Sequence, residues 1–382
     1  MKRVTVLGAT GSIGCSTADI MLRHPDKFSA YALVGYRNSE KMLQLAEQLN
    51  PDWVVMIDPD AVAILEGKLP TGTRLASGMD TAIDLCTAPE TDMVMAAMVG
   101  SAGVPATLAA VKAGKHVCLA NKECLVTAGR IIMAEAKRSG ALLLPVDSEH
   151  AAVHQCLSGQ HGGSVSRVIL TASGGPFWQR DSATLHSVTP QEAIAHPNWD
   201  MGAKISVDSA TMMNKALELI EARWLFDLAP EKLSAIIHPE SIIHAMVEYA
   251  DGSVLAQLAM PDMRMPVAYA MQLEPRLDTG IAWLDMTQQA SLRFQAVDTE
   301  RFPAMRLAQD VMNGDDSLAI AFNAANEVAN AAFLQCRIGF MDIVATTEEV
   351  LSRVENIPVG SLDDVWLHDE QARMLANEVM TA

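Results

Sequence analysis

The sequence predicts an α/β protein in three parts: an N-terminal doubly wound parallel sheet, a central α/β domain and a C-terminal α-helical domain. Three observations predict this architecture. Short, continuous apolar runs alternate with helical segments up to residue 145, as buried parallel strands alternate with their helices. Strand-like segments are more widely spaced after residue 150, and the tail from about 300 is alanine-rich. We expect domains over 1–145, 146–285 and 286–382, since 382 residues exceed what one core usually holds.

The first part alternates strand and helix from the start of the chain. One uncharged stretch, 93–111, is long enough to suggest a membrane span, but Gly100, Gly103 and Pro105 interrupt it. It is better explained as a strand, a turn and a helix. We expect strands at 4–7, 30–34, 53–57, 93–99, 116–120 and 142–146, and helices at 16–24 and 39–49.

The remaining elements follow from the same periodicities. In the loop-rich segment 172–203, Thr189, Pro190 and Glu192 form the pattern of a helix N-terminus with a capping box, and that helix ends near His196. We expect strands at 165–171, 234–237 and 254–260, and helices at 316–333 and 346–354.

The composition indicates a globular protein and argues against large anionic partners. Half of the residues are hydrophobic and 19% are charged, while the net charge of −18 argues against nucleic-acid or anionic-membrane partners. A small anionic ligand needs only a local cluster of donors and is not excluded. The six cysteines show no C-x-x-C spacing, so we expect reduced thiols. Because a strand and a glycine turn begin at once, we expect no signal peptide and a cytoplasmic location.

A glycine-rich turn, GATGSIG at residues 8–14, lies between the first strand and the first helix. Glycines permit close backbone approach, and the N-terminus of the following helix attracts a phosphate. The strand before and the helix after favour a Rossmann-like dinucleotide site over an ordinary glycine turn.

The end of the second strand indicates which dinucleotide binds. NAD sites usually place an acidic residue here, whereas this chain has Gly35, Tyr36, Arg37 and Asn38. Arg37 suits a 2′-phosphate and favours NADPH, although a solvated surface arginine is the alternative.

Two carboxylates follow the strand that ends near residue 146. In extended chain Asp147 and Glu149 would point the same way and repel each other unless a proton or cation lies between them. Either they are solvated loop acids, or they form part of a divalent-metal site that needs further ligands.

A helix within 205–218 supplies candidate partners. We expect its N-cap at Asp208 or Ser209, which places Asn214 and Glu218 on one face. Ser209, Asn214 and Lys215 resemble a phosphate cradle, and Glu218 is a candidate third carboxylate for Mg²⁺ or Mn²⁺. An amphipathic helix with an Asn–Glu hydrogen bond is the alternative.

Other polar residues follow predicted strands. Lys122 and Glu123 are either a surface ion pair or contacts to cofactor and substrate. The Ser173 hydroxyl in a glycine turn is a candidate phosphate ligand, although such turns are often only turns, and His196 is a further candidate site residue.

Six motifs in order, GATGSIG, LANKE, PVDSEH, ASGGPF, HPNWDMG and KISVDSATMMNKALE, resemble the 1-deoxy-D-xylulose 5-phosphate reductoisomerase family. The resemblance covers essentially the whole chain. It implies NADPH-dependent rearrangement and reduction of 1-deoxy-D-xylulose 5-phosphate to 2-C-methyl-D-erythritol 4-phosphate in the non-mevalonate isoprenoid pathway. It also implies a divalent metal as Lewis acid, a homodimer, NADPH binding by 1–145, catalysis by 146–285 and a mobile loop at about 187–200.

The resemblance also assigns residues. The metal positions are Asp147, Glu149 and Glu218. The substrate-phosphate positions are Ser173, Ser209, Asn214 and Lys215, and the other substrate positions are Lys122, Ser148 and His196. The cofactor positions are Thr10, Gly11, Ser12, Ile13, Gly35, Arg37, Asn38, Asn121, Glu123 and Gly202.

Three positions depart from the family pattern. Tyr36 replaces a usual glycine and affects the expected adenosine end of the cofactor pocket, while Cys124 and Ala151 replace small polar residues that are not assigned ligands. Two other functions remain open from the residues alone. One is an NADP-dependent semialdehyde or homoserine-type dehydrogenase, which needs no cluster of three acids, and the other is a non-catalytic dinucleotide sensor.

Overall fold

The computed structural model describes residues 1–160, 164–196, 199, 201–289 and 291–381, and it has the predicted α/β fold. Contacts divide the chain into two compact units. The first contains Met1–Cys124, Ile132–Ala151 and Asp262–Ala282, and the second contains Leu125–Ile131, Ala152–Pro261 and Trp283–Ala382. The predicted functional domains 1–145, 146–285 and 286–382 stay a prediction.

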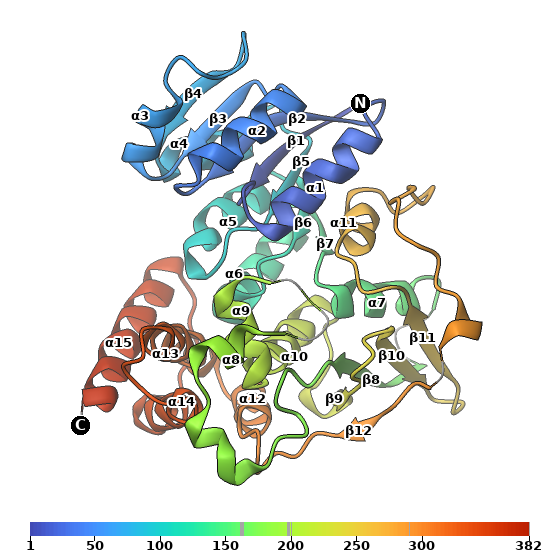
Figure 1. The fold of residues 1–382 in the computed structure, drawn as a ribbon, viewed down its shortest axis with the longest axis vertical. Helices are drawn as coiled ribbons and strands as arrows, with labels where there is room; N and C mark the ends of the chain where they lie inside the picture. Colours follow the sequence, from blue (N-terminus) through green and yellow to red (C-terminus); the bar gives the residue numbers. More distant parts are fainter. Residues whose placement is uncertain (161–163, 197–198, 200, 290, 382) are drawn as a thin grey trace. The chain divides into compact units, whose positions relative to one another are not determined.

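The first unit contains a seven-stranded sheet in the order β4-β3-β2-β1-β5-β6-β7, in which every neighbouring pair is parallel (Figure 1). The strands are β1 (Lys2–Leu7), β2 (Phe28–Gly35), β3 (Trp53–Met56), β4 (Arg74–Ser77), β5 (Met93–Ala96), β6 (His116–Leu119) and β7 (Leu142–Pro145). The helices that lie wholly in this unit are α1 (Ser12–Arg23), α2 (Ser39–Leu49), α3 (Pro59–Leu65), α4 (Met79–Thr87), α5 (Val104–Lys112) and α11 (Arg264–Met271). Two more helices, α6 (Glu123–Ser139) and α7 (Ser148–Leu157), have residues in both units.

The strand order reverses at β1, which lies between β2 and β5. Val4 and Val6 of β1 and Met93 of β5 are almost completely buried, as the apolar runs predict. In open α/β sheets the carboxyl ends of the strands at such a reversal form the ligand crevice. The glycine turn after β1 therefore lies where a cofactor is expected.

The uncharged stretch 93–111 forms β5, a short 3₁₀ helix at Ser101–Gly103 and α5, which confirms the prediction of a strand, a turn and a helix. Among the residues that the structure describes, no helix has both the length and the apolar character needed to cross a membrane. The six cysteines are free thiols, and four of them are buried.

The stretch 59–87 contains α3, β4 and α4, none of which the sequence analysis predicted. β4 is a four-residue edge strand with no fully buried residue, so it lacks the continuous apolar run of a central strand. β4 pairs with β3 because β3 offers its backbone hydrogen-bonding groups, and the residues of β4 themselves show no apolar strand pattern.

The second unit contains a mixed five-stranded sheet in the order β11-β10-β8-β9-β12. β8 is parallel to β9, whereas β10 is antiparallel to both β8 and β11. The strands are β8 (Val165–Ala172), β9 (Leu233–Ile237), β10 (Ile243–Tyr249), β11 (Val254–Leu258) and β12 (Gln295–Ala296). Of these, β10 and β12 were not predicted, because polar residues interrupt β10 and β12 is only two residues long.

Helices complete the second unit. Those in its part of the chain are α8 (Pro190–Ile194), α9 (Ala203–Ala210), α10 (Met213–Leu225), α12 (Ala304–Asn313), α13 (Asp316–Leu334), α14 (Asp342–Arg353) and α15 (Leu362–Thr381), with 3₁₀ turns at Ser182–Ser187, Pro230–Lys232 and Met286–Gln288. α10 packs its apolar face, including Leu217 and Ile220, into one core with the sheet and α12. The alanine-rich α13 contacts both α14 and α15 (Figure 1).

Candidate active site

The glycine turn has the backbone of a phosphate site. Gly8 has φ +77°, and a Cβ there would lie 2.3 Å from the carbonyl oxygen of Ala97, so only glycine fits. The turn leads into α1, whose N-cap is Gly11 and whose first turn starts at the exposed Ser12. No side chain caps this turn and no acidic residue lies in it, so its N–H groups suit an anion.

The end of β2 adjoins this turn. A Cβ on Gly35 would lie 3.4 Å from the side chain of Thr10, so these two predicted cofactor residues are neighbours. Arg37 is exposed, and its guanidinium lies over the Tyr36 ring, 4.7 Å from the centroid. The Asn38 side chain accepts a hydrogen bond from the backbone N–H of Lys41 and caps α2. Asn38 therefore has a structural role whether or not it contacts a cofactor.

The segment after β6 is buried rather than a surface ion pair. Asn121, Lys122 and Glu123 are each less than 10% exposed. The Asn121 amide donates to the Gly100 carbonyl at 2.9 Å, while its Oδ1 has no hydrogen-bond partner among the described residues. An unsatisfied buried acceptor is costly unless a ligand donor completes it. A ligand with an N–H or O–H group fits this position.

The acidic motif is not extended chain, so the geometric argument for parallel side chains is wrong. β7 ends at Pro145 and α7 begins at Ser148, which puts Glu149 in the first turn of a helix. Asp147 accepts a hydrogen bond from the Glu149 backbone N–H at 3.2 Å, as an N-cap does. The Ser148 hydroxyl donates to the Glu149 carboxylate. The two acids are thus brought together by a helix start.

Asp147 has a cation beside it within the first unit. The Lys122 ammonium lies 3.1 Å from Asp147 Oδ2, and the two side chains are only 8% and 12% exposed. A carboxylate this buried needs a nearby positive charge to stay ionised. Lys122 therefore links the motif after β6 to the motif after β7.

In the second unit, the segment 205–218 forms two helices rather than one. α9 ends at Ala210 and α10 starts at Met213, with Met212 in the left-handed region at φ +63°. The predicted N-cap at Asp208 or Ser209 is wrong, because both lie inside α9, whose N-cap is Gly202. Apolar residues on both sides of the break conceal it in the sequence.

The start of α10 gathers three predicted site residues. Asn214 and Lys215 both donate to the Glu218 carboxylate, which confirms that Asn214 and Glu218 share a face and includes the Asn–Glu hydrogen bond of the alternative. Lys215 is 3% exposed and Glu218 is 1% exposed, which rules out a solvated lysine here. A buried ammonium next to an amide donor can bind a second anion as well as Glu218.

The Ser173 turn and His196 also meet. Ser173 Oγ lies 2.8 Å from His196 Nε2, and the Trp199 backbone N–H donates to His196 Nδ1 at 3.0 Å. Burial lowers the pKa of His196 to about 4, so the ring is neutral and Nε2 carries its proton. Ser173 Oγ then accepts from His196 and from the Gly175 N–H, at 3.2 Å. Its own proton is left to donate to an acceptor such as a phosphate.

The Ser173 turn packs against the end of α9. Gly175 has φ +64°, and a Cβ there would lie 2.7 Å from the Ser209 carbonyl oxygen. The close approach brings the segments of the predicted phosphate ligands Ser173 and Ser209 together.

Within the predicted loop 187–200, the capping box at Thr189 and Glu192 is confirmed, whereas 197–198 and 200 lie outside the described residues.

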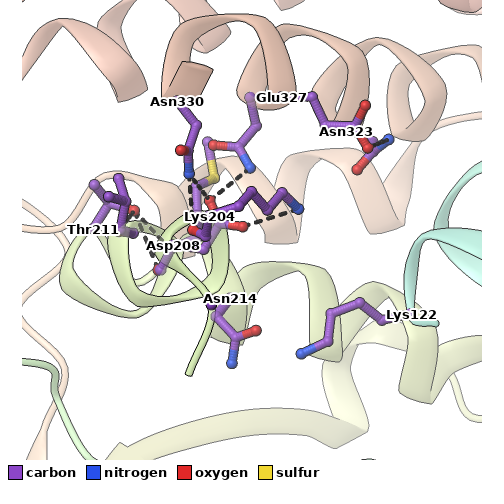
Figure 2. A network of polar contacts seen from close by, with 12 residues as sticks. Lys122, Lys204, Asp208, Thr211, Asn214, Asn323, Glu327 and Asn330 are labelled. Atoms are coloured by element: carbon purple, nitrogen blue, oxygen red, sulfur yellow. Dashed lines mark hydrogen bonds and ion pairs between the residues drawn. The ribbon is translucent and has the colours of Figure 1, made fainter. Parts of the chain in front are cut away.

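One buried polar cluster was not predicted from the sequence. Asp208 of α9 contacts Lys204, Asn326 and Asn330 (Figure 2). In the sequence, only the spacing of Asn326 and Asn330 on an apolar helix marks them. Asn326 and Asn330 are one turn apart, as partners of one group would be.

Comparison with known proteins agrees with these features. Three family models match: 1-deoxy-D-xylulose 5-phosphate reductoisomerase at 4–129, its C-terminal domain at 143–226, and the DXP reductoisomerase C-terminal domain at 258–375. The 1-deoxy-D-xylulose 5-phosphate reductoisomerase of Pseudomonas putida (strain W619) is 50% identical over 386 residues, which cover 99% of this chain and 98% of that protein.

Solved structures give the same result. A DOX-P reductoisomerase in complex with NADPH, fosmidomycin and magnesium has a TM-score of 0.93 and 39% identity, over 100% of this chain and 98% of that one. The enzyme from Zymomonas mobilis in complex with NADPH has a TM-score of 0.91 and 43% identity, over 100% of this chain and 99% of that one.

Proposed function

The chain belongs to the 1-deoxy-D-xylulose 5-phosphate reductoisomerase family, and we propose that it rearranges and reduces 1-deoxy-D-xylulose 5-phosphate to 2-C-methyl-D-erythritol 4-phosphate with NADPH. The reaction would belong to the non-mevalonate isoprenoid pathway. The observation that carries the proposal is the group of Asn214 with the buried Lys215 and Glu218, which places two anion donors beside a carboxylate of the kind that binds a metal. A simple dehydrogenase has no need of this combination.

The first unit supports the cofactor. The uncapped N-terminus of α1 would bind the pyrophosphate, and Arg37 would pair with the 2′-phosphate of NADPH. The unsatisfied Oδ1 of Asn121 supplies an acceptor for the cofactor. The full proposed set is Thr10, Gly11, Ser12, Ile13, Gly35, Arg37, Asn38, Asn121, Glu123 and Gly202.

The proposed phosphate ligands are Ser173, Ser209, Asn214 and Lys215. Ser173 offers its hydroxyl proton, because both of its acceptor positions are occupied by His196 and Gly175. Lys215 offers a buried positive charge. We propose that Lys122, Ser148 and His196 contact the rest of the substrate and that the loop at about 187–200 closes over it, which excludes water.

We propose that Asp147, Glu149 and Glu218 hold a divalent metal. Three carboxylates with no cysteine or histidine suit Mg²⁺ or Mn²⁺. When bound, the metal would act as a Lewis acid on the substrate carbonyl. The lysines offset the acid charges, since Lys122 pairs with Asp147 and Lys215 with Glu218.

A homodimer and a cytoplasmic location, both implied by the family, are proposed with the activity.

The test is NADPH oxidation with 1-deoxy-D-xylulose 5-phosphate and Mg²⁺ or Mn²⁺, followed by excess chelator. We expect turnover that the chelator abolishes. NADPH binding without turnover would favour a dinucleotide sensor. Oxidation of NADPH with a semialdehyde substrate, unaffected by the chelator, would favour a dehydrogenase.

A further inference from the structure

Asp208 is a charged residue in the interior of the second unit. Its side chain is 2% exposed, and Lys204, one turn earlier in α9, lies 3.0 Å from its Oδ2. The amides of Asn326 and Asn330 on α13 donate to Oδ1 at 2.9 and 2.8 Å (Figure 2). Asn330 also donates to the Lys204 carbonyl at 3.0 Å. One carboxylate thus connects two helices that are far apart in the sequence.

These contacts determine where α9 lies against α13. A buried carboxylate is tolerated only when charge and hydrogen bonds compensate it, and hydrogen bonds to an ionised group are short and directional. Asn326 and Asn330 are both 0% exposed, so water does not substitute for them. Apolar packing alone tolerates small slides of one helix over another, whereas these hydrogen bonds do not.

The residue that follows Asp208 is Ser209, a proposed ligand of the substrate phosphate. Thr211 closes this end of α9, since its hydroxyl contacts the carbonyls of Val207 at 3.0 Å and Asp208 at 3.2 Å. On the other side, the backbone of Gly175 packs against the Ser209 carbonyl. The backbone at Ser209 thus lies between Asp208, which α13 holds, and the Ser173 turn.

We propose that Asp208 is a positioning residue, which acts through Asn326 and Asn330 of α13 to orient Ser209 toward the phosphate. The C-terminal helix α13 thereby supports substrate binding without contact with the substrate. This inference rests on the proposed function and deepens it. The competing explanation is that the cluster only stabilises the fold.

A double-mutant cycle between Asp208→Asn and Ser209→Ala separates the two explanations. The loss of one hydrogen bond to a charged group costs about ten-fold or more in affinity, so we expect Asp208→Asn to raise KM for 1-deoxy-D-xylulose 5-phosphate by about that factor. We expect little change in kcat or in NADPH affinity. In the Ser209→Ala background, Asp208→Asn should raise KM no further. The same rise in both backgrounds would overturn the positioning role.

A second pair of variants changes residues of α13 and leaves the sequence of α9 unchanged. Asn330→Ala removes a partner of Asp208, whereas Asn323→Ala is the matched control. Asn323 is equally buried on the same helix, but its amide donates to Glu327 at 3.2 Å. We expect Asn330→Ala to raise KM and Asn323→Ala to leave it unchanged, although both lower the melting temperature. Equal KM values for the two variants would overturn the proposal, even if Asp208→Asn does not fold.

The unmodified protein is assayed first, so that two kinds of failure stay distinct. Absence of turnover by the unmodified protein would overturn the proposed function and the positioning role with it. Additive effects in an active enzyme would overturn only the positioning role.

Discussion

At the scale of single residues, each half of the proposed metal site contains an acid beside a buried lysine. Asp147 pairs with Lys122 in the first unit, and Glu218 pairs with Lys215 in the second. Each lysine is less than 10% exposed, so these pairs are not the weak ion pairs of a protein surface. Buried ionisable groups of this kind are concentrated at functional sites.

Glu218→Gln tests the metal assignment. The amide keeps the shape of the side chain but removes the charge, so we expect turnover at limiting Mn²⁺ to fall about a hundred-fold or more. Excess Mn²⁺ should restore part of the rate, and NADPH binding, followed by its fluorescence, should be unchanged. Normal turnover at limiting Mn²⁺ would remove Glu218 from the metal site.

At the scale of elements, the turn after β8 and the end of α9 are joined through a glycine. Gly175 combines φ +64° with a contact that excludes a Cβ. The structure therefore requires glycine here for two reasons, whereas a turn in open space requires it for only one. A glycine with both constraints and a glycine with only a positive φ therefore provide a test substitution and its control.

Gly175→Ala is expected to raise KM for the sugar phosphate at least ten-fold, because the new methyl group must push Ser209 away from its position. Gly252→Ala is the control, since Gly252 has φ +84° but nothing within 4 Å of the added Cβ. Gly252→Ala should lower the free energy of unfolding by about 1 kcal/mol through backbone strain alone and leave KM unchanged. Steady-state kinetics and thermal melts distinguish the two. Similar KM values would refute the proposed contact with the phosphate site.

At the scale of the whole molecule, a partly buried imidazole makes folding sensitive to acid. His116 begins β6, and its Nε2 lies 2.8 Å from the Ala270 carbonyl on α11. Burial, helped by the charge of Lys2, lowers the pKa of His116 to about 4. The unfolded chain has an ordinary histidine pKa near 6.5, so it takes up a proton first as the pH falls. The stability that the neutral His116 contributes is therefore fully present above pH 6.5 and is lost progressively as the pH falls toward 4.

Between pH 7 and pH 5 this histidine should cost on the order of 1–2 kcal/mol of unfolding free energy. His116→Gln keeps an N–H for the Ala270 carbonyl and should flatten the dependence of stability on pH over this range. The same change at the exposed His186 should leave the slope as it is. Urea unfolding at pH 7 and pH 5 measures the difference. An unchanged slope for His116→Gln would show that the imidazole is not held neutral by the fold.

The sequence by itself determined what local patterns encode. Buried runs placed the strands β1 and β5 to within a few residues, and the capping box at Thr189 and Glu192 placed the start of α8. The i,i+4 spacing of Asn214 and Glu218 predicted that they share a face, and their hydrogen bond is the one expected from the structural alternative. These features depend on neighbours within one helical turn or one strand, and such neighbours are visible in the chain itself.

The tertiary structure alone decided the rest. The edge strands β4 and β12 exist because a neighbouring strand offers its backbone, and their own residues carry little pattern. The break at Met212 and the helical start at Ser148 corrected two local predictions. Asp208 finds Asn326 and Asn330 at separations of 118 and 122 residues. No periodicity spans such distances, because only the packing of α9 on α13 brings these side chains together.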